Sequence, residues 1–346
     1  MFDKIFLSLH PKINCYNLFI MSKVLGIGNA LVDILFRLEN DNLITELGLL
    51  KGSMQLVDKD FKNLVFSKTQ QLNRAQASGG SAANTIHGLA SLGVETGYIG
   101  KIGNDNLGEF FTSDIIKNHI KPFLKISETE TGVASTLISL DSERTFGTFL
   151  GAAVEVGVDD LDEAIFAGFQ YFHIEGYLVL NTALVEKALK IAKAKNMKVS
   201  LDLASFNVVE ANLDFLREIT AKYVDIVFAN EEEAKAFTGK EPEGALSEIA
   251  SMCNIAIVKI GKNGSLIQQG DEIFRVGAIP AKVIDTTGAG DLYAAGFLYG
   301  LTKGLSPDRC GHIGALLAGN VIQVMGAKIP AEAWERIKKM VKTLEE

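Results

Sequence analysis

The chain has 346 residues, 47% of them hydrophobic, which suffices for about two domains with a sizeable buried core. It carries 34 Lys and Arg against 42 Asp and Glu, a formal net charge of −8. A disordered or fibrous chain is therefore excluded. Nucleic acid is not an expected partner, because the chain as a whole lacks the positive charge that binding to phosphate backbones requires.

The cysteines and the first twenty residues indicate a cytoplasmic protein. Three cysteines lie far apart without a Cys-x-x-Cys pair, which favours reduced thiols over a disulfide framework. No stretch is apolar over the roughly 20 residues that a membrane span needs, so no membrane partner is expected. Residues 1–20 contain charges and lack a signal-peptide cleavage site. Since Met21 directly precedes the first strand-like segment, we expect translation to begin there and residues 1–20 to be an extension that is not native to the fold.

The first strand-like segment ends in the sequence GIGNALVD, residues 26–33. A dinucleotide-binding loop would need a third glycine where Leu31 stands, and the following residues read as extended rather than helical, so we reject that site. Asn29 and Asp33 are polar residues in an apolar stretch. They are interpreted as ligands of a polyol, because a carboxylate can accept two hydroxyls at once. The alternative is a turn asparagine beside an exposed aspartate.

Two stretches of the N-terminal half, residues 34–58 and 129–150, show partial alternation of apolar and polar residues without a helix between the members of each pair. We expect them to form a small inserted β-sheet that acts as a lid. The rest of the chain from Met21 is then the α/β core, in three pieces: residues 21–33, 59–128 and 151–346.

The segment SGGSAAN, residues 78–84, stands at the start of a predicted helix. The paired Gly79 and Gly80 let a ligand approach the backbone closely, and the amide of Asn84 can hold a hydroxyl. The alternative is a helix start whose small residues serve tight packing.

From residue 171 onward, short apolar runs rich in β-branched residues alternate with segments of helical periodicity. Strands too apolar to have a solvated face are typical of a parallel sheet covered by helices on both sides. The sequence therefore predicts a doubly wound, mostly parallel α/β fold.

Asn230 and Glu233 follow one of these predicted strands, in the sequence NEEE. They are candidates for a magnesium–water network near nucleotide phosphates. The alternative is an ordinary helix start, with Asn230 as N-cap and acids in the first turn. The five histidines show no metal-ligand spacing, and no Walker A motif occurs.

The strongest local signal is DTTGAGD, from Asp285 to Asp291, between an apolar strand and an apolar helix. Backbone N–H groups at Gly288, Ala289 and Gly290 can converge on an anion, and the helix dipole adds positive potential there. A carboxylate at the rim of such a phosphate site, Asp291, can accept the proton of an attacking hydroxyl. The alternative is a glycine-rich turn in which Asp291 is a favourable first-turn acid.

In this order along the chain, GGS followed by Asn84, N-x-x-E and DTTGAGD resemble the motifs of the ribokinase-like (PfkB) family of sugar and nucleoside kinases. The resemblance covers essentially the whole chain from Met21. Within the family the chain is most similar to adenosine kinases, on GNALVDI, on the arginine-led strand that begins at Arg144, and on the stretches around the N-x-x-E and DTTGAGD motifs.

The resemblance implies that ATP phosphorylates the 5′-hydroxyl of a nucleoside, adenosine giving AMP, with Mg²⁺ present. Asp291 would take the hydroxyl proton, and the turn from Gly288 to Gly290 would stabilise the charge that develops on the transferred group. The residues implied for the acceptor and for the lid above it are Asn29, Leu31, Asp33, Leu56, Gly79, Gly80, Ser81, Asn84 and Phe146. Those implied for ATP and, through water at Glu233, for Mg²⁺ are Asn230, Glu233, Gly261, Thr287 and Asn320. In some members a monovalent cation such as K⁺ also binds, and its candidate ligands here are Asp285 and Thr287.

Two other functions stay open. One is a sugar kinase of the same family, acting on ribose, fructose or 2-keto-3-deoxygluconate. The other is a non-catalytic nucleoside- or sugar-binding relative. The resemblance is compatible with a monomer and with a homodimer that pairs lid strands.

Overall fold

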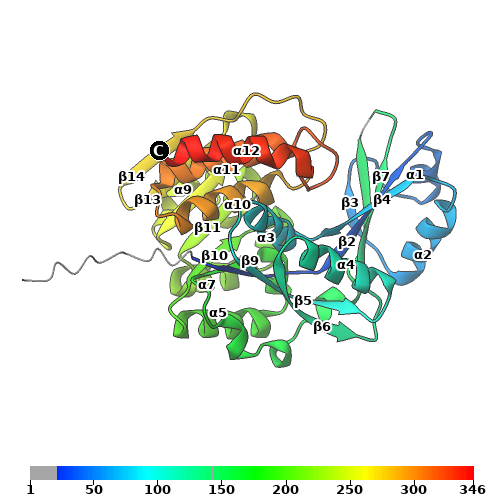
Figure 1. Ribbon diagram of the computed structural model, residues 1–346, viewed down its shortest axis with the longest axis horizontal. Helices are drawn as coiled ribbons and strands as arrows, with labels where there is room; N and C mark the ends of the chain where they lie inside the picture. The colour runs from blue at the N-terminus through cyan, green and yellow to red at the C-terminus, as the bar shows by residue number, and fades with distance from the viewer. Residues whose placement is uncertain (1–21, 142) are drawn as a thin grey trace, which may run out of the picture.

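The computed structural model describes residues 22–141 and 143–346. The expectations for residues 1–20 and for a start at Met21 lie outside the described residues. A large sheet runs through the centre of the molecule, and a smaller sheet projects from one side of it (Figure 1).

The large sheet has nine strands in the described chain, in the order β14-β13-β12-β11-β10-β9-β1-β5-β6. Every pairing from β6 to β12 is parallel, whereas β13 and β14 are added antiparallel at one edge. The strands are β1 Val24–Ile27, β5 Thr96–Gly103, β6 Ile120–Ser127, β9 Tyr171–Glu175, β10 Lys198–Asp202, β11 Ile226–Asn230, β12 Ile255–Lys259, β13 Ser265–Gln269 and β14 Glu272–Val276.

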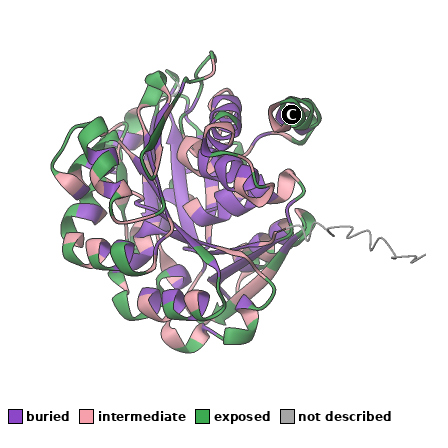
Figure 2. Cartoon of the chain, turned by 90° about the vertical axis from the view of Figure 1, so that its left-hand side faces the viewer, coloured by how far each residue is buried: buried purple, intermediate pink, exposed green. Residues whose placement is uncertain are grey.

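Helices bury both faces of this sheet, because successive side chains of a strand point to opposite sides. Val24 packs in one hydrophobic cluster and its neighbour Leu25 in the other. The helices of the Val24 cluster are α3 Ser81–Ser91, α4 Asn106–Lys117, α10 Ala289–Thr302, α11 Pro307–Val321 and α12 Ala331–Glu345. Those of the Leu25 cluster are α5 Thr182–Ala194, α6 Phe206–Ala211, α7 Leu213–Tyr223, α8 Glu231–Thr238 and α9 Pro242–Ala250. Figure 2 shows buried strands between partly exposed helices, and the predicted doubly wound fold is confirmed.

The small sheet has the strand order β3-β8-β7-β2-β4. Its strands are β2 Leu31–Arg37, β3 Met54–Leu56, β4 Arg74–Gly79, β7 Gly132–Ile138 and β8 Arg144–Phe149, and helices α1 Asn42–Glu46 and α2 Lys59–Lys68 accompany it. Both stretches in which the sequence predicted lid strands contribute to this sheet, which is thus inserted into the chain as expected.

The small sheet extends further along the chain than the sequence predicted. Strand β4 lies within residues 59–128, which we assigned to the core, yet it pairs antiparallel with β2. Helix α2 lies in the same range, and its Phe66 packs edge-on against Phe36 of β2. Strand β4 reads RAQASG, and its first three residues are exposed. Hydrophobic alternation gives little sign of it, because the alternating apolar residues are only Ala75 and Ala77.

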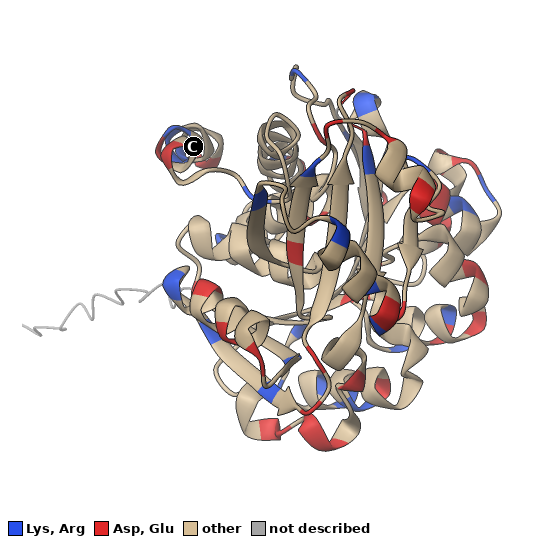
Figure 3. Cartoon of the chain, turned by 90° about the vertical axis from the view of Figure 1, so that its right-hand side faces the viewer, with Lys and Arg blue, Asp and Glu red and all other residues tan. Residues whose placement is uncertain are grey.

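Acidic and basic residues are interspersed along the outer helices in the view of Figure 3. In the part of the chain that the structure describes, no helix combines the length and apolar character needed to cross a membrane.

Candidate active site

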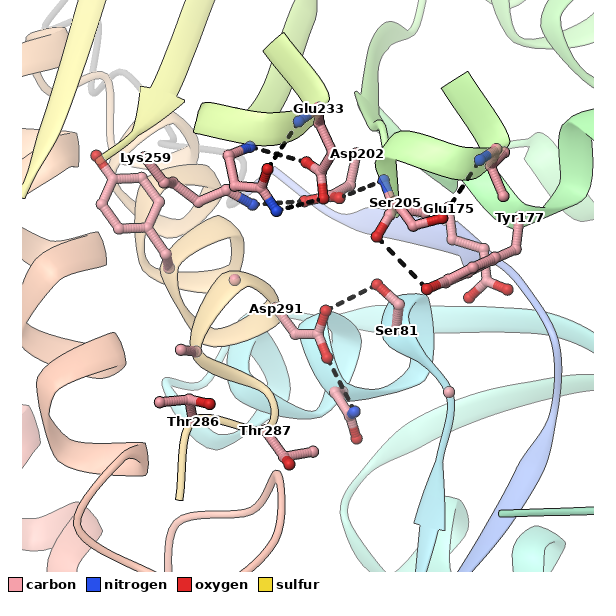
Figure 4. Close-up of a pocket in the computed structure, with 18 of the residues that line it drawn as sticks. Ser81, Glu175, Tyr177, Asp202, Ser205, Glu233, Lys259, Thr286, Thr287 and Asp291 are labelled. Atoms are coloured by element: carbon pink, nitrogen blue, oxygen red, sulfur yellow. Dashed lines mark hydrogen bonds and ion pairs between the residues drawn. The ribbon is translucent and has the colours of Figure 1, made fainter. Parts of the chain in front are cut away.

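A cleft of about 1800 Å³ runs along the carboxyl ends of the parallel strands, where ligands of doubly wound sheets bind. Four adjacent strands each end in a polar residue that lines it: Glu175 of β9, Asp202 of β10, Asn230 of β11 and Lys259 of β12. Residues of the small sheet, among them Leu31, Met54 and Thr148, line the same cleft. In Figure 4, the strand-end side chains of Glu175, Asp202 and Lys259 lie opposite Asp291 of α10.

Asp291 lies in the first turn of α10, and two residues of α3 hold its carboxylate. Ser81 Oγ donates to Oδ1 at 2.7 Å, and Asn84 Nδ2 donates to Oδ2 at 3.0 Å (Figure 4). Burial raises the pKa of Asp291 to about 6, while these two hydrogen bonds oppose the rise. The carboxylate is thus mostly ionised at neutral pH and close to the pKa at which a general base works well. We expected Ser81 and Asn84 to bind the acceptor. Both line the cleft, and the hydrogen bonds described here connect them to Asp291.

The turn before α10 is the expected anion hole, and Gly288 fixes its backbone. Gly288 is its N-cap with φ of +76°, and a Cβ there would lie 2.6 Å from the Cβ of Ala327, so only glycine fits. Ala289 and Gly290 follow as the first helical residues and line the cleft, as does Thr287. Their N–H groups lie at the positive end of a 14-residue helix.

Asp285 fixes the shape of this turn. Its carboxylate accepts hydrogen bonds from the N–H groups of Thr287 at 3.0 Å and Gly326 at 2.7 Å. Arg144 of β8 completes the arrangement with a 2.6 Å ion pair to Asp285, and both side chains are almost fully buried. Arg144 Nη1 also donates to Thr287 Oγ1 at 3.1 Å. A monovalent cation at Asp285 and Thr287 therefore does not fit, because the guanidinium already supplies the positive charge there.

We call the part of the cleft lined by Asn29, Leu31, Asp33, Leu56 and Gly80, the residues expected at the acceptor, the acceptor half. Glu175, which was not among the predicted site residues, holds Asn29 in this half. Glu175 Oε1 accepts from the backbone N of Asn29 at 2.8 Å and from its Nδ2 at 2.7 Å, and Oε2 accepts from Ala82 N at 3.0 Å. Burial raises the pKa of Glu175 to about 7. A Cβ on Gly28 would lie 2.3 Å from Oε2, so this glycine makes room for the carboxylate. A charged residue at the end of a buried strand was the available signal.

Asp33 lines the cleft beside Asn29, and Gly79 makes room for it. A Cβ on Gly79 would lie 2.4 Å from the Asp33 carboxyl, and Gly79 itself is not part of the lining, whereas Gly80 is. Burial raises the pKa of Asp33 to about 7, and the charge of Lys328 opposes that rise. No hydrogen bond from the described residues engages the Asp33 carboxylate, which leaves it free to accept hydroxyls.

The wall of the acceptor half is apolar. Leu31 and Leu56 line it as expected, and other apolar residues extend it, notably Met54, Val154 and Leu180. Leu56 and Leu180 are each more than 60% exposed, and with the other apolar residues of the lining they present an apolar surface to the cleft. Phe146 does not line the cleft, contrary to expectation, and lies opposite Met54 in the β3–β8 pair.

Asn230 and Glu233 form a capping box at the start of α8. With Lys259, Gly261 and Lys262 they line the part of the cleft that we call the nucleotide half. Glu233 Oε2 accepts from Asn230 N at 2.8 Å and Oε1 from its Nδ2 at 2.7 Å, while Asn230 Oδ1 accepts from Glu233 N at 2.8 Å. Burial and the charge of Asp202 raise the pKa of Glu233 to about 7. The helix-start interpretation is therefore true of this motif, and both side chains also line the cleft with Gly261.

Asn320 does not line the cleft, which corrects the expectation that it borders ATP. Its Nδ2 donates to Leu316 O at 2.8 Å, and its Oδ1 accepts from Arg336 of α12 at 2.6 Å. The residues of this segment that do line the cleft are Ala315, Ala318, Gly319 and Ile322. The helical period places Asn320 on another face of α11 from these four.

Comparison with known proteins gives a consistent result. The family described as pfkB family carbohydrate kinase matches residues 54–334. The chain is 36% identical to the adenosine kinase from Sinorhizobium meliloti, with a TM-score of 0.82 over 93% of this chain and 99% of that one. It is also 36% identical to a probable sugar kinase from Rhizobium etli CFN 42, with a TM-score of 0.84 over 92% of this chain and 98% of that one.

A protein described as an uncharacterized sugar kinase from Archaeoglobus fulgidus is 29% identical over 70% of this chain and 96% of its own length. The resemblance drawn from the sequence motifs is thus confirmed. With its doubly wound sheet, its Gly-Ala-Gly turn and a match over most of its length, the chain belongs to the pfkB family of carbohydrate kinases.

Proposed function

We propose that the protein transfers the γ-phosphoryl group of ATP to the 5′-hydroxyl of a nucleoside, adenosine being the acceptor that we expect. Kinases of this family use ATP with Mg²⁺. The observation that carries the proposal is Asp291, an ionisable carboxylate beside the Gly288–Gly290 turn and facing the acceptor half of the cleft. A non-catalytic relative would have no need of this pairing of base and anion hole.

The chemistry follows from these positions. The 5′-oxygen attacks the γ-phosphorus in line, its proton passes to Asp291, and the bond to the bridging oxygen breaks so that ADP leaves with the electron pair. The N–H of Gly290 and the positive end of α10 stabilise the charge on the transferred oxygens, whereas the N–H of Ala289 donates to Thr286 O at 3.2 Å. Asn29 and Asp33 bind the ribose 2′- and 3′-hydroxyls and thereby orient the 5′-hydroxyl.

A nucleoside fits the acceptor half better than a charged sugar does. Among the described residues that line the cleft, Lys259 and Lys262 are the only lysines or arginines, and both lie in the nucleotide half. A sugar phosphate or sugar acid would therefore find no lysine or arginine in that part of the lining to pair with. Asp33 would repel it, and the charge of Lys328 would only reduce that repulsion. The apolar wall at Leu31, Leu56 and Leu180 instead offers a surface to a purine base.

The residues of the nucleotide half fit Mg²⁺ that is bound through water. Both carboxylate oxygens of Glu233 already accept hydrogen bonds from Asn230, and no group of three or more metal-binding side chains exists within the described ranges. Burial, followed by the charge of Asp202, raises the pKa of Glu233 to about 7, and a hydrated cation close by would favour the ionised carboxylate. When bound, the ion neutralises charge on the ATP phosphates.

A screen of acceptors by coupled ADP release tests the proposal. The acceptors are adenosine, inosine, guanosine, ribose, fructose and 2-keto-3-deoxygluconate, each with ATP and Mg²⁺. We expect the highest kcat/KM with adenosine, and ³¹P NMR should identify the product as the 5′-monophosphate. Turnover confined to the sugars would replace the proposal with the sugar kinase. Saturable nucleoside binding without ADP release would favour the non-catalytic relative.

A further inference from the structure

Lys259 ends strand β12 immediately beside the anion hole. A Cβ atom built on Gly290 would lie 3.0 Å from Lys259 Nζ. The absence of a side chain at Gly290 thus lets the ammonium reach the backbone at the start of α10. The Lys259 side chain lines the cleft and is only 16% exposed, so its position is set by packing rather than by solvent (Figure 4).

Asp202 holds the ammonium in this place. Its Oδ2 lies 3.1 Å from Nζ, and its own side chain is 8% exposed. Burial by itself would lower the pKa of Lys259, but the charges of Asp202, Glu233 and Asp291 raise it above its usual range. The lysine therefore remains charged inside the cleft, at the boundary between the nucleotide half and the general base.

An ammonium has three donors, and the hydrogen bond to Asp202 uses one of them. No other hydrogen bond from Nζ exists within the described chain, so two donors remain for a ligand. A ligand atom bound at the Gly290 N–H would lie near these donors, because Nζ approaches Gly290 closely. We propose that Lys259 is a catalytic residue whose ammonium donates to the oxygens of the phosphoryl group in transfer. This inference rests on the proposed phosphoryl transfer and adds a side-chain cation to the backbone anion hole.

The competing explanation is charge balance alone. Asp202 and Glu233 are buried acids, and a lysine between them lowers the cost of keeping them ionised. In that case Lys259 would matter for folding and would affect ATP and ADP binding equally. A contact with the transferred group instead predicts an effect that appears only when a γ-phosphate is present.

The first test is kinetic. Removal of one donor from an anion hole lowers kcat by about 10²- to 10³-fold. We expect a loss of kcat of this size in Lys259→Met. The KM for adenosine should change little. Lys198→Met is the matched control, because Lys198 lies on the same sheet and pairs with Asp225 at 3.2 Å, but is 57% exposed at the far end of β10. The control should keep wild-type kcat. A kcat for Lys259→Met within threefold of wild type would overturn the inference.

The second test does not need turnover, and it separates this inference from the proposed function. Calorimetry gives the affinities for ADP and for the nonhydrolysable triphosphate AMP-PNP, both with Mg²⁺. We expect Lys259→Met to lose at least about tenfold more affinity for AMP-PNP than for ADP. Equal losses would assign Lys259 to charge balance, even if wild-type protein phosphorylates adenosine. If wild-type protein releases no ADP with any acceptor, the proposed function fails, and the affinity ratio still reports on the γ-phosphate contact.

The double variant Lys259→Met/Asp202→Asn covers the case in which the single variant does not fold. It removes both charges together, so no unpaired buried carboxylate remains at residue 202. We expect the same selective loss of AMP-PNP affinity in this background relative to Asp202→Asn alone. Recovery of the wild-type affinity ratio in the double variant would contradict the inference, because it would show that the lysine serves only to neutralise Asp202.

Discussion

Replacement of Asp291 by Asn should abolish most activity and yet stabilise the fold. A positioned general base contributes about 10²- to 10⁴-fold to the rate, so we expect kcat to fall by that factor in Asp291→Asn. ATP affinity should change little, since the backbone of the Gly288–Gly290 turn is left intact. The carboxylate is also the group whose burial is most costly at this end of α10.

The size of the stabilisation follows from the pKa. Burial raises the pKa of Asp291 from 3.8 to about 6, and a difference of this size corresponds to about 3 kcal/mol. Because the pKa in the folded protein lies above the unfolded value, this penalty is absent below pH 3.8, grows between pH 3.8 and 6, and is complete at pH 7. An asparagine avoids it but loses one acceptor for Ser81 or Asn84, worth about 1 kcal/mol. A net gain of about 1–2 kcal/mol should remain at neutral pH.

Urea unfolding at pH 4 and pH 8, together with coupled ADP release, measures both effects. Asp308→Asn is the matched control, because Asp308 is also a first-turn acid, in the adjacent helix α11, and 43% of its side chain is exposed. The control should keep its kcat and show no pH-dependent gain in stability. If Asp291 were only a favourable first-turn acid, Asp291→Asn would be less stable at pH 8 and would retain turnover, and that result would refute the reasoning.

Three further outcomes are expected. Asp33→Ala should raise the KM for the nucleoside by at least about tenfold with a smaller effect on kcat, and in wild type that KM should rise as the pH falls below the Asp33 pKa of about 7; an unchanged KM would contradict the ribose role. Arg144→Met should lower the free energy of unfolding by about 3–5 kcal/mol, because it leaves the buried Asp285 carboxylate unpaired, and a loss below 1 kcal/mol in urea unfolding would contradict this. Gly288→Ala should lower both kcat and the melting temperature, since alanine is strained at a φ of +76° and meets Ala327; a variant with wild-type kcat and melting temperature would exclude this constraint.

The sequence predicts those parts of the fold and site that are formed by residues close together in the chain. The glycines between Asp285 and Asp291 predict a turn at the start of a helix. The apolar strands from residue 171 onward predict the parallel sheet. Short motifs also predicted four binding residues that line the cleft in the structure: Asn29, Asp33, Gly80 and Asn84. In each case the backbone conformation and the side chain that uses it lie within a few residues of one another.

Residues whose importance depends on tertiary contacts were not predictable in this way. Glu175, Asp202 and Lys259 each end an ordinary buried strand, and they become a group only when the sheet aligns the ends of β9, β10 and β12. The family resemblance implied that Asn320 borders ATP, but the helical period turns it towards Arg336. Strand β4 has no apolar pattern and is defined by its pairing with β2.

A crystal structure of the protein with adenosine, AMP-PNP and Mg²⁺ tests the central claim most directly. It should place the 5′-oxygen at about 2.6–3.2 Å from an Asp291 carboxylate oxygen, with the γ-phosphate at the N–H of Gly290. A ternary complex in which the Asp291 carboxylate contacts neither the 5′-hydroxyl nor a water bound to it would contradict the claim.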